Sequence, residues 1–142
     1  LKGRADRIDA SASALRILDY KTGSPPTIRS VETLYQTQLA LLAAIAHAGG
    51  FGPKVRGTTA SLDYLQLSGG LEPGKERWAL GKDPQAGKLE DHLKAAFDDF
   101  TALAAGWLLG EQPFRAKQHM VYGRRFSDFD HLARVAEWLG RR

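Results

Sequence analysis

The order of periodic segments along the 142-residue chain predicts an α/β or α+β domain, with helices packed on a small mixed sheet. Two strand-like segments come first and are separated by a run of small residues. A helical segment with an apolar stripe follows, and then two further strand-like segments and two amphipathic helices. One hydrophobic core suffices for a chain of this length, so residues 1–142 are predicted to form a single domain.

The first two predicted strands are residues 1–9 and 14–20, joined by a short loop of small residues. Alternation along the second strand places Asp19 on one face, together with two apolar residues. We expect Tyr20, on the other face, to lie in the core. Residues 21–27 contain Gly and two Pro, which predicts a loop after this strand.

The remaining elements follow from periodicity and from helix start and stop signals. A helix over residues 31–48 begins with Ser30 as its N-cap and ends at Gly49-Gly50. Further strands are predicted over residues 59–67 and 77–80, and further helices over residues 88–109 and 128–139.

Composition excludes several kinds of function. The chain has no Cys, so a disulfide, a thiolate zinc site and an iron–sulfur cluster are excluded within this segment. Its apolar segment 39–48 is too short to span a bilayer, and we expect a cytoplasmic protein with no membrane partner. The net charge of +4 is compatible with a polyanionic partner.

Two other groups of residues are candidates for binding sites. Cations alternate with aromatic residues in segment 115–126, as they do on surfaces that bind single-stranded nucleic acid; a solvated face is the alternative interpretation. The histidines show no metal-ligand spacing, so each is interpreted as structural or exposed. These histidines are His47, His92, His119 and His131.

A carboxylate and an ammonium lie two residues apart at the end of the second strand, at Asp19 and Lys21. Residues two apart share one face of a strand, so both side chains project from the end of an otherwise apolar segment. Burying a charged pair there costs free energy, which is unexpected unless the pair has a functional role.

The hairpin is expected to place a second carboxylate beside the first. If it closes over residues 11–14, Ile8 lies opposite Ile17 and Asp6 lies opposite Asp19. Two carboxylates about 5 Å apart repel each other unless a cation lies between them, and Mg²⁺ takes oxygen ligands. A shift of one residue in the register would turn Asp6 to the other face.

This arrangement predicts phosphodiester hydrolysis. A metal ion held by Asp6 and Asp19 can polarise a phosphate and lower the pKa of a bound water. Lys21 beside it would orient that water or stabilise charge on the pentavalent phosphate.

The string GRADRID at residues 3–9, followed by DYKTG at residues 19–23 and a helical Gln, resembles the RecB-like nuclease domains of the PD-(D/E)XK superfamily. Their pattern is G-x-x-D, then D-Y-K-[ST], then a Gln with an aromatic residue four positions on. The resemblance implies a restriction-endonuclease-like core and Mg²⁺ or Mn²⁺ as the metal. It implies metal ligands at Asp6, Asp19 and the backbone carbonyl of Tyr20, a catalytic lysine at Lys21, and Gln38 as the helix residue that reaches the active site.

The sequence departs from this pattern in some places. Leu42 stands where the aromatic residue is expected, and Gln36 is a competing candidate for the Gln position. The family's upstream metal ligand would precede Leu1, so we expect a fragment that lacks its first helix. Residues 111–142 are expected to be a C-terminal extension of the same domain.

The segment FSDFDHLARVAEW at residues 126–138 is similar to the C-terminus of alphaproteobacterial AddB, the nuclease-bearing partner of AddA in double-strand-break repair. The similarity implies an exonuclease that degrades single strands of DNA delivered by an AddA-like helicase–nuclease subunit. One alternative is a weak or inactive module of the same fold that binds DNA or docks AddA. Another is an interaction domain unrelated to DNA, which would bind no divalent metal.

The acidic residues of the first strand also have structural interpretations. Asp6 could pair with Arg4 or Arg7 instead of holding a metal. Asp9 competes with Asp6 as a ligand, but alternation points it to the opposite face, where we expect it to pair with Arg16.

Two further alternatives concern the end of the second strand and the helix. Asp19 and Lys21 could form a surface ion pair, which is a common and weak feature. Gln38 could be an ordinary exposed helix residue.

Overall fold

The computed structural model is described here for residues 1–71, 73–81, 86–113, 131–132, 134 and 137. The chain divides into two compact units, Leu1–Leu103 and Ala104–Arg142. The first unit holds the sheet and the helices that pack on it. The second begins with a short π-helical turn, η1 (Ala105–Leu109), and includes an ion pair between Arg134 and Glu137.

A four-stranded mixed sheet forms the centre of the first unit, in the order β1-β2-β3-β4. Its strands are β1 (Arg7–Ala10), β2 (Ala14–Lys21), β3 (Thr58–Leu67) and β4 (Gly74–Trp78). The β1/β2 and β3/β4 pairs are antiparallel, whereas β2 and β3 are parallel. This sheet with its helices confirms the predicted fold class.

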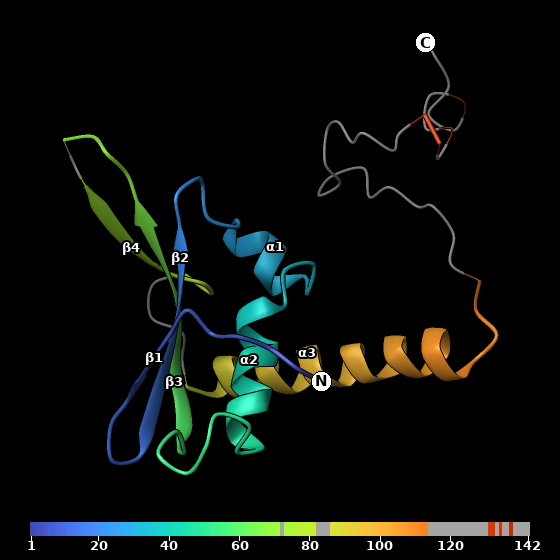
Figure 1. Ribbon diagram of the computed structural model, residues 1–142, viewed down its shortest axis with the longest axis horizontal. Helices are drawn as coiled ribbons and strands as arrows, with labels where there is room; N and C mark the ends of the chain where they lie inside the picture. The colour runs from blue at the N-terminus through green and yellow to red at the C-terminus, as the bar shows by residue number, and fades with distance from the viewer. Residues whose placement is uncertain (72, 82–85, 114–130, 133, 135–136, 138–142) are drawn as a thin grey trace. The chain divides into compact units, whose positions relative to one another are not determined.

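Three helices accompany the sheet: α1 (Ile28–Glu32), α2 (Gln38–His47) and α3 (Ala86–Ala104). Parallel strands cannot be joined by a tight turn, so the chain crosses from β2 to β3 through α1 and α2. In Figure 1, α1 and α2 lie on one side of the sheet, and α3 begins on the same side. No helix among the described residues is long and apolar enough to cross a membrane.

The core lies between this side of the sheet and the helices. Alanines on α2 allow the helix backbone to approach the strands closely, and Ala43 and Ala46 are fully buried. The cluster of buried residues draws on every layer of the first unit. It includes Ile17, Leu62 and Tyr64 of the sheet, Val31 of α1, Leu39, Ala40, Leu42 and Ala43 of α2, and Leu89 and Ala96 of α3.

The single helix predicted over residues 31–48 is wrong, because the chain breaks into α1 and α2. Thr27 is the N-cap of α1, and its side chain accepts a hydrogen bond from the Ser30 backbone N–H at 3.1 Å. Ser30 is therefore a residue of α1 and not an N-cap. Leu34 then adopts a left-handed backbone conformation (φ 59°), which cannot continue a helix, so α2 begins afresh at Gln38.

Several predicted boundaries also shift. The strand predicted over residues 77–80 lies at Gly74–Trp78, after a turn in which the Ser68 N–H donates to the Pro73 carbonyl. The strand predicted over residues 1–9 is confined to Arg7–Ala10. The helix predicted over residues 88–109 is confirmed as α3 and η1. The helix predicted over 128–139 and the basic segment 115–126 lie outside the described residues, apart from a few positions of the former.

Tyr20 was expected in the core but is exposed, with 37% of its surface accessible. The sheet residues of the main hydrophobic cluster, Ile17, Leu62 and Tyr64, lie on the side to which Ile17 points. Alternation along β2 turns Tyr20 to the opposite side, which the described helices leave uncovered.

Candidate active site

Side chains from three strands, β2, β3 and β4, form a row across the helix-covered face of the sheet. The register of the β1/β2 hairpin pairs Ile8 with Ile17, as predicted, and pairing ends one residue before Asp6 would meet Asp19. On the other side, Asp19 pairs with Tyr64 of β3, which pairs with Arg77 of β4. Paired residues of neighbouring strands point the same way, so the row shares one face.

Asp6 is tied to the end of β2 by a hydrogen bond. Its Oδ2 accepts the backbone N–H of Tyr20 at 3.0 Å. Arg7 pairs instead with Asp9, at 2.7 Å. Asp6 is therefore held at the backbone of Tyr20, the residue that follows Asp19 on β2.

Asp19 is a buried carboxylate with a neighbour on each oxygen. Oδ1 accepts a hydrogen bond from Nε2 of Gln38 at 2.9 Å. Oδ2 is buried and lies 2.6 Å from Nζ of Lys21, with which it forms an ion pair. Only 4% of the Asp19 side chain is exposed, which excludes an ordinary surface ion pair.

The Lys21 ammonium lies between this carboxylate and an aromatic ring. Its Nζ is 5.9 Å from the centroid of the Tyr64 ring. Burial raises the pKa of Tyr64 to about 12, and the negative charge of Asp19 adds to the effect while Arg77 opposes it. The phenol is therefore protonated and neutral near pH 7, and the charge next to Lys21 resides on Asp19.

Gln38 reaches the site because it is the first residue of α2. The packing of α2 on β2 places this end of the helix beside Asp19, and Gln38, not Gln36, makes the contact. Leu42, one turn further on, is 5% exposed and belongs to the core. The residue that replaces the family's aromatic side chain thus packs inside the domain.

Gly3, the glycine of the G-x-x-D motif, lets the N-terminal segment approach α2 closely. A Cβ at this position would lie 2.9 Å from side-chain atoms of both Leu42 and Ile45. Real Cβ atoms essentially never come this close, so a side chain here would require the terminal methyl groups of Leu42 and Ile45 to move. Because Asp6 follows three residues later, this close approach helps to place the carboxylate.

The carboxylate pair fits a divalent cation. Among the residues that the structure describes, no group of three or more His, Cys, Asp or Glu could hold a metal ion. Asp6 and Asp19 alone match Mg²⁺, which commonly uses one or two carboxylates and completes its shell with waters and substrate phosphates. The buried Oδ2 of Asp19 lacks a hydrogen bond and is a suitable donor. The role of the Tyr20 backbone carbonyl as a further metal ligand stays a prediction.

The histidines in the described part of the first unit have structural surroundings. His47 lies 3.0 Å from the Thr59 hydroxyl, measured from Nε2. His92 is buried on α3, where burial lowers its pKa. His131 lies in the second unit, and His119 lies outside the described residues.

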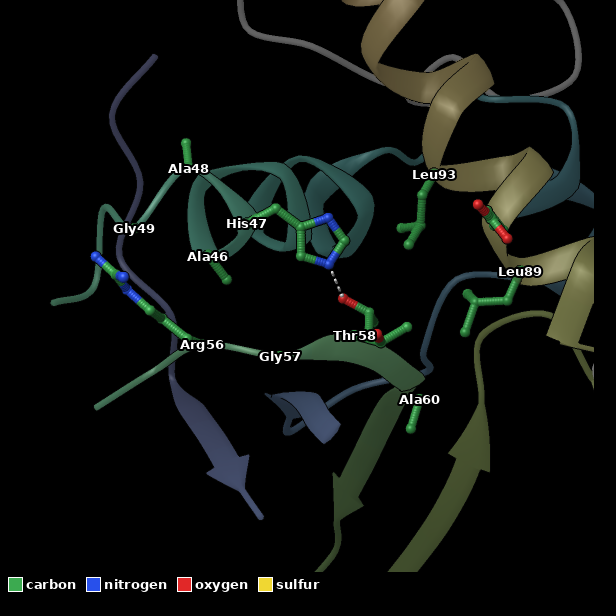
Figure 2. A pocket seen from close by; sticks show the side chains of 12 residues that line it. Ala46, His47, Ala48, Gly49, Arg56, Gly57, Thr58, Ala60, Leu89 and Leu93 are labelled. Atoms are coloured by element: carbon green, nitrogen blue, oxygen red, sulfur yellow. Dashed lines mark hydrogen bonds between the residues drawn. The ribbon is translucent and has the colours of Figure 1, made fainter. Parts of the chain in front are cut away.

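One cavity of the first unit is separate from the carboxylates. It measures about 1000 Å³ and opens between the end of α2, the start of β3 and the start of α3. Figure 2 shows His47 reaching from α2 toward β3, with Leu89 and Leu93 of α3 on the other side. Thr59 on its wall precedes Tyr64 by five residues of β3, which places it about 16 Å along the strand from the candidate site.

A buried ion pair occupies the opposite face of the sheet. Nε of Arg16 donates to Oδ2 of Asp63 at 2.7 Å, and Ser61 donates to the same oxygen at 2.7 Å. The guanidinium also contacts Glu76. Asp9 lies on this face directly opposite Arg16, as expected, and Arg7 and, to a smaller extent, Arg16 lower the pKa of its carboxyl. The ion pairs of Arg16 are formed with Asp63 and Glu76, however, and Asp9 forms its own with Arg7.

Arg77 ties the loop after Lys21 to the sheet, which the sequence did not predict. Its guanidinium donates to the backbone carbonyls of Pro25, at 3.3 Å, and of Pro26. Two prolines cannot donate hydrogen bonds themselves, but their carbonyls accept them. The loop therefore leaves β2 along a fixed path.

These features define a class of protein. A mixed sheet with a β–α–β crossover and a carboxylate–lysine pair at the end of its second strand are consistent with a restriction-endonuclease-like nuclease fold. A family model for the PD-(D/E)XK nuclease superfamily matches residues 1–124, which is most of the chain. The chain belongs to this superfamily. No curated protein and no solved structure matches it.

Proposed function

We propose that this protein is a Mg²⁺- or Mn²⁺-dependent deoxyribonuclease that hydrolyses phosphodiester bonds in single-stranded DNA. Membership of a nuclease superfamily supports hydrolysis of nucleic acid. The observation that carries the proposal is the buried Asp19 carboxylate, held by Gln38 and Lys21 beside a second carboxylate at Asp6. The assignment of DNA as substrate rests on the sequence resemblance.

The energetics of this cluster favour a functional role. Burying a carboxylate costs free energy unless hydrogen bonds and an opposite charge compensate for it. Asp19 receives one hydrogen bond and one ammonium, and Oδ2 still lacks a hydrogen bond. A cation at this oxygen would complete its coordination.

Each residue then has a distinct task. Asp6 and Asp19 would hold the metal ion, which supplies Lewis-acid activation of a water and of the scissile phosphate. Gln38 fixes the orientation of Asp19, and the Tyr20 N–H fixes that of Asp6. Lys21 would donate a hydrogen bond to the attacking water or to a phosphate oxygen on which charge develops.

We further propose that the enzyme is an exonuclease that processes double-strand breaks together with an AddA-like helicase–nuclease subunit. This part rests on the similarity of residues 126–138 to AddB, and most of that segment lies outside the described residues. The net charge of +4 is compatible with a DNA substrate.

Metal binding and cleavage test the proposal together. Mn²⁺ is titrated calorimetrically into the wild-type protein, into Asp19→Asn and into Asp91→Asn, a control at an exposed position of α3. We expect binding that Asp19→Asn abolishes and Asp91→Asn preserves. Single-stranded and duplex oligonucleotides, labelled at either end, are then incubated with Mg²⁺, and shortening from one end is expected on the single strand.

Other outcomes would contradict the proposal in different ways. Metal binding without cleavage would favour a DNA-binding or docking module of the same fold. Absence of metal binding in the wild-type protein would remove the metal-dependent mechanism. Internal cuts would contradict the exonuclease assignment alone.

A further inference from the structure

Lys21 is held from two sides, by Asp19 and by the ring of Tyr64. The proposed mechanism gives Asp19 a role but gives none to Tyr64. Nζ lies 2.6 Å from Oδ2 of Asp19 and 5.9 Å from the centroid of the Tyr64 ring. A Lys ammonium within about 6 Å of a ring centroid is attracted by the negative face of the ring. Tyr64 is 1% exposed, so its ring faces Lys21 without contacting solvent.

We propose that Tyr64 is a positioning residue for Lys21, and that its ring holds the ammonium at the active site when Asp19 is engaged by a metal ion. The proposal deepens the function proposed above and rests on it for the catalytic task of Lys21. The contact between the two side chains stands independently of that function.

The reason lies in what happens to the ion pair. Lys21 ends a flexible four-carbon stem, and its ion-pair partner is the carboxylate that would also hold the metal. A divalent cation at Asp19 offsets the negative charge that attracts the ammonium and also repels the ammonium directly. The attraction of an uncharged ring persists, so Tyr64 keeps Lys21 in place when Asp19 attracts it less.

The fold makes Tyr64 a rigid support. It lies within β3, in register with Asp19 on one side and Arg77 on the other, and it belongs to the hydrophobic core. The ring face, and not the hydroxyl, provides the contact with Lys21. A phenylalanine at position 64 should therefore support Lys21 as Tyr64 does, whereas an aliphatic residue should not.

Cleavage kinetics test the role of the ring. We expect Tyr64→Phe to keep kcat within about threefold, while Tyr64→Leu lowers kcat on the order of tenfold with little change in KM, because Tyr64 is buried away from DNA. Leu62→Ala, two residues earlier on the same face, is the control for a loss of packing; activity per folded molecule should be unchanged. A ring-fluorinated phenylalanine at position 64 keeps the volume but weakens the ring's negative face, and should lower kcat as Tyr64→Leu does.

The position of Lys21 can be measured without any cleavage. The chemical shift of the Lys21 Cε protons is measured in the metal-free protein and with Mg²⁺, which is diamagnetic and takes the place of Mn²⁺. In both conditions the ring should shift these protons upfield in the wild type and in Tyr64→Phe. Tyr64→Leu should abolish this shift.

Equal kcat for the fluorinated and the phenylalanine variants would overturn the proposal, as would loss of the upfield shift on addition of Mg²⁺. If the wild type cleaves no DNA, the proposed function fails, and the resonance of Lys21 still decides whether Tyr64 holds it. If Tyr64→Leu does not fold, the fluorinated variant takes its place in both the cleavage kinetics and the measurement of the Lys21 chemical shift.

Discussion

Gln38, the first residue of α2, donates its side-chain amide to Oδ1 of Asp19 at 2.9 Å. This hydrogen bond joins the helix to the strand that carries the proposed metal ligand. It fixes the plane of a carboxylate whose other oxygen faces Lys21. The start of α2 therefore determines the orientation of a group on β2.

Removal of this amide should impair cleavage more than folding. Partners that orient metal ligands are typically worth 10–100-fold in metal affinity or activity, so we expect about a tenfold loss in Gln38→Ala. Single-turnover cleavage and Mn²⁺ titration measure the two effects. Gln36→Ala, two residues before the helix, is the matched control, and an equal loss in that variant would refute the specific role of Gln38.

Substitution of Asp6 should abolish metal binding and leave the hairpin intact. In Asp6→Asn, the amide oxygen can still accept the Tyr20 N–H, but the negative charge is lost. We expect a loss of activity on the order of 100-fold or more, since a direct ligand matters at least as much as its partners. Asp9→Asn, on the opposite face of β1, should behave as the wild type, and similar defects in both variants would argue against Asp6 as the ligand.

These assignments show how far the sequence alone could go. The register of the hairpin followed from alternation and a short loop: Ile8 pairs with Ile17, and the pairing ends at Arg7 and Leu18, one residue before Asp6. Such local pairing depends only on residues close in sequence. The contact of Gln38 with Asp19 came from a family resemblance, because nothing in the local pattern could reveal how α2 packs on β2.

Loss of the Arg77 clamp should loosen the loop after Lys21. Arg77→Ala removes the hydrogen bonds to the Pro25 and Pro26 carbonyls, and we expect about 1–3 kcal/mol less stability in chemical unfolding. Proteolysis within residues 22–27 should become faster and cleavage of DNA slower. Lys75→Ala, two residues earlier on β4 and exposed, should change neither rate; unchanged proteolysis in Arg77→Ala would rule out the clamp.

The ion pair on the far face should contribute to stability and not to chemistry. Arg16→Met leaves the fully buried Asp63 carboxylate without its cation, at a cost of about 3 kcal/mol; partial exposure of Arg16 puts this at the low end for such pairs. Adding Asp63→Leu should restore most of the stability. Activity per folded molecule should be unchanged in both, and a lack of recovery in the double variant would contradict this account.

His92 should make the protein less stable in mild acid. Burial lowers its pKa below the ordinary 6.5; nearby Glu32 opposes this and Lys88 adds to it. The unfolded chain therefore binds the proton more readily, so this contribution to stability is complete above about pH 6.5 and is lost as the pH falls through the lower folded-state pKa. Denaturant unfolding at a series of pH values should show a smaller loss between pH 7 and 5 in His92→Gln, with matching slopes above pH 7. A wild-type slope in the variant would exclude His92 as the cause.

The structural features that the sequence did not predict depend on contacts between segments that are distant along the chain. Arg16 lies opposite Asp9 in the hairpin, yet it forms its ion pair with Asp63 on β3, a strand more than 40 residues later in the sequence. The break between α1 and α2 depends on the left-handed conformation of Leu34, a residue with no propensity for it. The position of Tyr64 under Lys21 depends on the parallel pairing of β2 with β3, which the local pattern of the sequence does not reveal.

That parallel pairing has a consequence for how the protein is made. The hairpin that carries Asp19 and Lys21 is complete once residue 21 has left the ribosome, and its contacts are local. β3 is synthesised later, and its pairing with β2 requires closure of the intervening crossover. A nascent chain that ends before β3 thus carries the acidic groups without the ring beneath the lysine or the core beneath α2. The surroundings of Asp19 and Lys21 are completed only when the second half of the sheet has been translated and folded against the first.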